Sequence, residues 1–135
     1  MAIDAPDWVR QVVISVIVEN VPVPPDAANQ VAAGGKGRYT GTDTTYQAVV
    51  TWTVTAAKVG ELKEILIISD LYAKTLLKVT VGSVTWATDW AIQSSMPIIF
   101  EDLKLAAASV IKVEAKSSDG TSITVDAIIV GKEVG

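Results

Sequence analysis

The chain is a succession of short segments in which apolar and polar residues alternate, and this pattern constrains the fold more than any other feature. A period of two is typical of a β-strand with one buried face. It is clearest at residues 47–56, 75–81, 110–117 and 122–130, with shorter or less regular segments at 62–69, 84–90 and 97–100. Turn signals recur roughly every 8–12 residues. The sequence therefore predicts an all-β fold, an antiparallel β-sandwich of about eight strands, and that strand number favours a jelly roll.

The phase of the alternation also predicts which side chains form the core. Trp52 lies on the apolar face of its strand, so we expect it to be buried rather than to bind a ligand. Asp119 and Gly120 predict a tight hairpin between the last two strands. No segment has a convincing amphipathic helix pattern, and residues 102–108 are long enough for one helical turn only. The remaining residues expected on core faces are Val50, Val54, Leu77, Val79, Val81, Ile111, Val113, Ala115, Ile123, Val125, Ala127 and Ile129.

The N-terminal third differs from the rest of the chain. Residues 11–19 are β-branched on both strand faces, so we expect this strand to be covered on both sides, within its own domain or by another chain. Three prolines in residues 20–26 indicate an extended linker. Four glycines in residues 27–41 favour a mobile loop. The expected organisation is a single domain with an arm, an apolar strand and a glycine-rich loop at 1–45, followed by a body at 46–135.

The two-sided apolar segment supplies the candidate oligomer interface. Trp8 precedes it on a polar stretch, and aromatic residues with a polar tip are frequent at interfaces. The candidate interface residues are Trp8, Val12, Val13, Ile14, Val16, Ile17 and Val18.

Composition excludes several classes of chemistry. The 135 residues include no cysteine and no histidine, which removes disulfide scaffolds, zinc fingers and Ser-His-Asp triads. The net charge of −4 argues against nucleic acid as a partner. The acidic start and the short apolar run fit neither a signal peptide nor a membrane span. We expect a non-enzymatic protein made in the cytoplasm, with no cofactor, metal, nucleic-acid or membrane partner.

Exposed aromatic residues leave one alternative open, a carbohydrate-binding module. Trp86 and Trp90 are four residues apart, which places them on one face of a continuous strand. With Tyr72 they are the candidate sugar-stacking residues, although the two tryptophans are equally suited to closing one end of the sandwich.

Three stretches carry a family resemblance: residues 53–65, residues 77–82 and the final pair of strands at 111–133 with Ser118, Asp119 and Gly120 between them. Their succession of strands and turns resembles that of the small jelly-roll structural proteins of tailed bacteriophages and archaeal viruses, of the decoration, fibre or turret type. The resemblance implies a homo-oligomer, with a trimer favoured, whose N-terminal arm reaches a neighbour. It implies a place in the virion beside a capsid or other virion protein, possible contact with a host surface glycan, and no catalytic residues.

Overall fold

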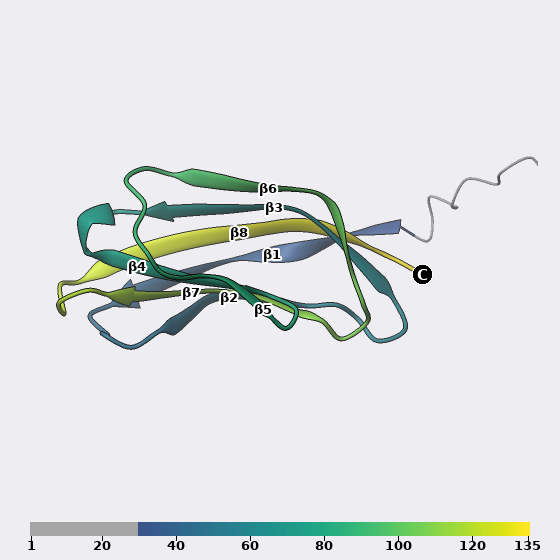
Figure 1. The fold of residues 1–135 in the computed structure, drawn as a ribbon, viewed down its shortest axis with the longest axis horizontal. Helices are drawn as coiled ribbons and strands as arrows, with labels where there is room; N and C mark the ends of the chain where they lie inside the picture. Colours follow the sequence, from purple (N-terminus) through teal and green to yellow (C-terminus); the bar gives the residue numbers. More distant parts are fainter. Residues whose placement is uncertain (1–29) are drawn as a thin grey trace, which may run out of the picture.

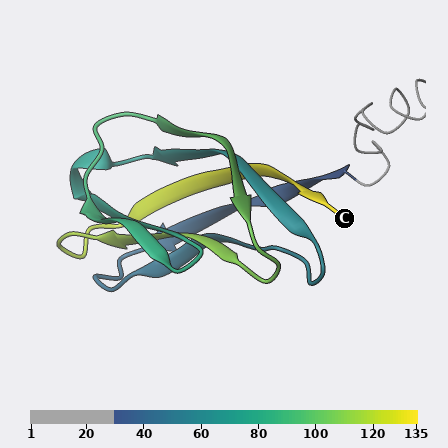
Figure 2. The same cartoon turned by 45° about the vertical axis from the view of Figure 1, so that its right-hand side comes forward.

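A computed structural model describes residues 30–135, which form eight strands in two four-stranded antiparallel sheets (Figures 1 and 2). The predicted antiparallel β-sandwich is confirmed. The elements are β1 (Gln30–Gly41), β2 (Gln47–Thr53), β3 (Val59–Ser69), the 3-10 turn η2 (Tyr72–Lys74), β4 (Thr75–Val81), β5 (Val84–Trp90), β6 (Met96–Leu105), β7 (Val110–Ser117) and β8 (Ile123–Val134).

The order of strands pairs the first half of the chain with the second. One sheet, here sheet A, has the order β1-β8-β3-β6, and the other, sheet B, has the order β2-β7-β4-β5. Thus β1 pairs with β8, β2 with β7, β3 with β6 and β4 with β5, as in one long antiparallel ribbon folded over on itself. The sheet edges are therefore β1 and β6 in sheet A and β2 and β5 in sheet B.

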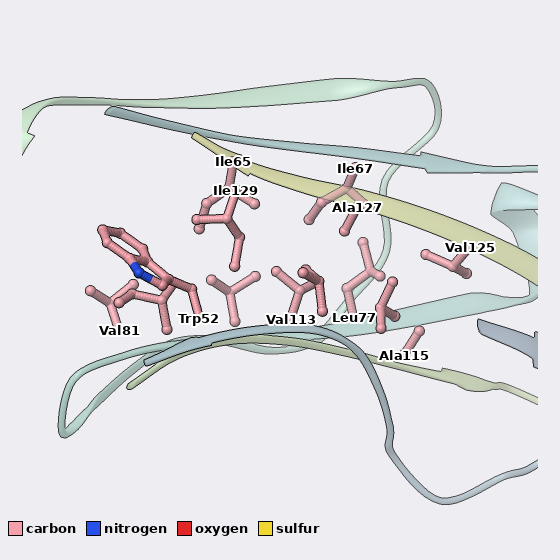
Figure 3. Close-up of a cluster of buried hydrophobic side chains, with 14 of the residues drawn as sticks. Trp52, Ile65, Ile67, Leu77, Val81, Val113, Ala115, Val125, Ala127 and Ile129 are labelled. Atoms are coloured by element: carbon pink, nitrogen blue, oxygen red, sulfur yellow. The ribbon is translucent and has the colours of Figure 1, made fainter. Parts of the chain in front are cut away.

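The core lies between the sheets, where alternate residues of the inner strands meet (Figure 3). All the residues predicted on core faces are buried. Trp52, the largest of them, crosses from sheet B into a space left by two glycines of sheet A. A Cβ at Gly131 would lie 2.9 Å from the indole ring, and one at Gly60 would lie 3.4 Å from it. These glycines make room for the tryptophan.

The prediction of a glycine-rich loop is wrong, because Gln30–Gly41 is strand β1 and pairs along its length with β8. The sandwich thus begins at Gln30 rather than near Tyr46. The glycines serve close packing: a Cβ at Gly37 would lie 1.9 Å from the Val49 carbonyl oxygen on β2. The sheets therefore come together tightly along the β1–β2 side. The candidate interface residues Trp8 to Val18 lie outside the described residues.

One further local prediction, the hairpin between the last two strands, is wrong. Asp119 and Gly120 do not close a hairpin, since β7 belongs to sheet B and β8 to sheet A; Gly120 has a positive φ of 86°, but the turn carries the chain between sheets. Residues 102–108 form no helical turn, because β6 continues to Leu105. A tight turn does occur at Gly82 and Ser83, where β4 pairs directly with β5.

Candidate functional site

On the side of the sandwich opposite β1 and β2, the edge strands of the described sheets are β6 of sheet A and β5 of sheet B. Between them lies a cleft of about 640 Å³, a volume within the usual range of ligand pockets. Its lining is almost entirely apolar. The lining residues are Val79 of β4, Trp86, Ala87, Thr88 and Trp90 of β5, and Ile98, Ile99 and Phe100 of β6.

Aromatic rings form the walls of this cleft. Trp86 from sheet B and Phe100 from sheet A meet edge to face, with 6.3 Å between ring centroids and 76° between planes. Trp86 nevertheless remains 60% exposed. Trp90 is half-buried and lines the same cleft. A large aromatic side chain left this exposed beside apolar neighbours marks a surface suited to a partner.

The structure brings together only part of the residue set predicted for sugar stacking. Trp86 and Trp90 share the cleft, although two register shifts make β5 an irregular strand. Tyr72 lies in η2 and lines a separate hollow with Ala91 and Ile92. Sequence reasoning missed Ile99 and Phe100, because their meeting with β5 depends on strand order, which a local pattern does not reveal.

A hydrogen-bonded cluster fixes the irregular part of β5. Asp89, between Thr88 and Trp90, has a positive φ of 51°. The Tyr46 hydroxyl donates a hydrogen bond to the Asp89 carboxylate, and the Asp89 backbone N–H donates to the Tyr46 hydroxyl oxygen at 2.7 Å. Lys116 Nζ lies 2.9 Å from the same carboxylate. The hydrogen bonds from Tyr46 and Lys116 lower the pKa of Asp89, while burial and this carboxylate raise the pKa of Tyr46 to about 12. The Asp89 carboxylate is thus engaged in holding the cleft wall.

The outer faces of the two sheets differ in chemistry. Sheet A carries a largely apolar band across three neighbouring strands, in which Ile128 and Leu66 are paired and Leu66 and Pro97 are paired. One charged residue, Glu64 of β3, lies within the band, paired with Val130 on one side and Ile99 on the other. Ile99, at the β6 edge of the band, is 72% exposed. The outer face of sheet B instead presents threonines and charges. The band consists of Leu66, Ile68, Pro97, Ile99, Ile128 and Val130, and the polar face includes Thr51, Lys78, Thr80, Lys112, Glu114 and Lys116.

Charged pairs border the apolar band at both ends. At one end Arg38 makes two hydrogen bonds to Asp126, at 2.6 and 3.0 Å. At the other end Glu61 contacts Lys104 at 2.8 Å and Lys132 at 3.2 Å, and hydrogen bonds from these lysines lower the pKa of Glu61. These charged side chains are paired with one another at each end of the apolar band.

The described part of the chain has no group of three or more Cys, His, Asp or Glu side chains able to hold a metal ion. Within residues 30–135 there is also no helix long and apolar enough to cross a membrane. No protein-family model matches the chain, and no curated protein matches it.

Proposed function

We propose that the protein is a non-enzymatic structural protein of a virion or similar assembly, of the capsid-decoration, fibre or turret type. In this proposal it forms a homo-oligomer, with a trimer favoured, and its N-terminal arm takes part in the contacts. The single observation that carries the proposal is the apolar band on the outer face of sheet A, which the polar outer face of sheet B lacks.

The apolar band would be costly to leave in water. Ile68, Ile128 and Val130 are each 38–42% exposed. Covering such a side chain contributes roughly 1 kcal/mol, and contiguous apolar patches are typical of interaction surfaces. A partner that covers the band and leaves the polar face in solvent accounts for the difference between the two faces.

The strand order gives independent support. Among the described strands, β1 pairs with β8 and β2 with β7 in two four-stranded sheets, and this order supports the jelly-roll part of the proposal. This is the architecture implied by the resemblance to small viral structural proteins. Jelly rolls also occur in lectins, so architecture supports the proposal only together with the apolar band.

A charge placed in the band tests the proposal. Ile128→Asp should convert the oligomer to single chains, because an unpaired carboxylate would have to be buried in the interface. Thr51→Asp, on the exposed face of sheet B, is the matched control and should leave the mass unchanged. Light scattering gives the mass, and circular dichroism checks that both variants fold. Equal masses for the two variants would contradict the proposed interface.

The carbohydrate-binding module remains a second candidate, favoured by the exposed ring of Trp86. Its weakness is the cleft lining, in which Thr88 and the two indole N–H groups are the polar side-chain groups. Sugar recognition needs several hydrogen bonds in addition to stacking. Glycan-array binding that is lost on Trp86→Ala, with the fold intact, would establish this function instead.

A further inference from the structure

We infer that the cleft between β5 and β6 receives residues 11–19 of a second copy of this chain. The inference rests on the proposed function, since it requires an oligomer, and it names the surface that receives the arm. Two features support it. The apolar cleft at one side of the sandwich is open, and the sequence of residues 11–19 is that of a strand with two apolar faces.

An extended segment beside β6 would contact apolar side chains on both of its faces. On the inner side it presents the rings of Trp86 and Phe100. On the outer side, along the same edge strand β6, it presents the exposed side chain of Ile99, which continues the apolar band of sheet A. A strand placed beside β6 would therefore bury both of its faces, one in the cleft and one beside the band.

Residues 11–19 have the matching pattern. Val12, Ile14 and Val16 would face the aromatic rings, and Val13 and Ile17 would face outward beside Ile99. Ser15, the polar residue within the apolar run, falls on the outward side, where solvent is close. β-Branched residues also lose little rotamer freedom on entering a strand. A strand with one polar face would leave half of this surface uncovered.

Backbone pairing contributes less than side-chain burial. Among the strands of residues 30–135, β6 is an edge strand, so its outer side can accept an added strand. However, Phe100, Glu101 and Asp102 bulge opposite Lys63, which separates the regular part of β6 at residues 96–99 from its last three residues. The bulge also limits addition by unrelated strands, so the cleft favours a segment whose side chains fill it.

Geometry favours the segment of a second copy over that of the same chain. Gln30 pairs with Val134 at one end of sheet A, whereas Met96 pairs with Ile67 near the other end. For an antiparallel strand beside β6, the gap back to Gln30 is roughly 30 Å from strand spacings alone. The eleven Cα-to-Cα steps from residue 19 to Gln30 span at most about 36–40 Å, which exceeds this direct gap only slightly, and the spacer would also have to pass around the sandwich. Prolines at 22, 24 and 25 stiffen this spacer and suit it to bridging two bodies.

Cysteine trapping tests the inference directly, because the chain has no cysteine of its own. Full-length Ile14→Cys and an epitope-tagged Thr88→Cys chain are co-expressed and mildly oxidised. We expect a disulfide-linked pair containing one chain of each kind on a non-reducing gel. The matched controls are Val13→Cys, on the opposite face of the segment, and Thr51→Cys, on the outer face of sheet B. Each control pairing should lose the mixed band.

The outcomes separate this inference from the proposed function. An oligomer by light scattering that gives no mixed band above the controls would overturn the cleft as the receptor and leave the assembly in place. A single-chain mass would overturn both. A disulfide that forms only within one chain carrying both Ile14→Cys and Thr88→Cys would overturn the exchange between copies. Binding of glycans that is unaffected by deletion of residues 1–26 would assign the cleft to sugar instead.

Discussion

Glu133 is a buried carboxylate whose hydrogen bonds join the two sheets. It lies on β8 of sheet A and is 8% exposed. It accepts hydrogen bonds from the Thr55 N–H at 2.9 Å and from Trp52 Nε1 at 3.2 Å, both on or beside β2. The hydrogen bond from Thr55 is the main cause of the lowered pKa of Glu133. The indole that fills the core is thus also oriented by a charge at its rim.

This carboxylate should make stability depend on pH. Because its folded pKa is below the ordinary value of 4.5, its contribution is fully present above pH 4.5 and is lost as the pH falls through the folded pKa. Glu133→Gln should therefore be less stable than the wild type at neutral pH and lose less stability on acidification. Urea unfolding between about pH 6 and pH 3 measures this. Parallel pH profiles for the two proteins would contradict the role assigned to the charge.

Neighbouring residues of β8 test the assignment of its two faces. Ile123 is completely buried, whereas Thr124 is partly exposed and its hydroxyl forms a hydrogen bond with the Thr40 hydroxyl at the surface. Ile123→Ala should cost about 2–5 kcal/mol of unfolding free energy through lost burial and a cavity. Thr124→Ala should cost below about 1 kcal/mol. Chemical denaturation compares them, and a larger cost at Thr124 would show that the faces are reversed.

At the scale of strands, local pattern was a good guide wherever one strand face is buried. The expected segments 75–81, 84–90 and 110–117 coincide with β4, β5 and β7. Alternation succeeds here because the sheets have one inner and one outer face, so burial has the same period as the backbone.

The local sequence pattern gives wrong predictions where contacts with residues far away in the sequence determine the structure. The glycines of β1 indicate a loop when taken alone, yet one of them, Gly37, is required by the Val49 carbonyl oxygen across the sandwich. The Asp119 and Gly120 pair indicates a hairpin, yet the chain changes sheets there. The cleft could not be found from sequence for the same reason, since strand order alone brings Trp86 to Phe100.

Two glycines of β1 provide a matched test at this scale. A Cβ at Gly37 would meet the Val49 carbonyl oxygen at 1.9 Å, whereas one at Gly35 would meet Val50 Cγ2 at an ordinary 3.7 Å. Gly37→Ala should push β1 from β2 and cost about 1–3 kcal/mol or more. Gly35→Ala should change stability by less than about 1 kcal/mol in either direction. Thermal and urea unfolding measure both, and equal effects would argue against close packing at Gly37.

On the scale of the whole molecule, the two sides of the described sandwich differ: the sheets pack closely at β1 and β2 and leave an apolar cleft between β5 and β6. Glycines bring β1 against β2, while aromatic residues hold β5 and β6 around an open cleft. In the proposed function, this asymmetry and the apolar band of sheet A would direct association to one part of the surface.

Removal of residues 1–26 should expose the cleft between β5 and β6 without removing any described strand, since β1 begins at Gln30. We expect the truncated protein to retain its β-sheet circular dichroism but to become monomeric or to aggregate, because the cleft loses its occupant. An unchanged oligomer after truncation would exclude the N-terminal segment from the contacts.

The most direct test of assembly is the absolute molar mass of the full-length protein in solution, by light scattering after size exclusion. The proposed structural role predicts a discrete oligomer, with three times the 14.2 kDa mass of one chain favoured. A mass of 14.2 kDa across a range of protein concentrations would contradict it, because the apolar band and the cleft would then both face water in the stable state.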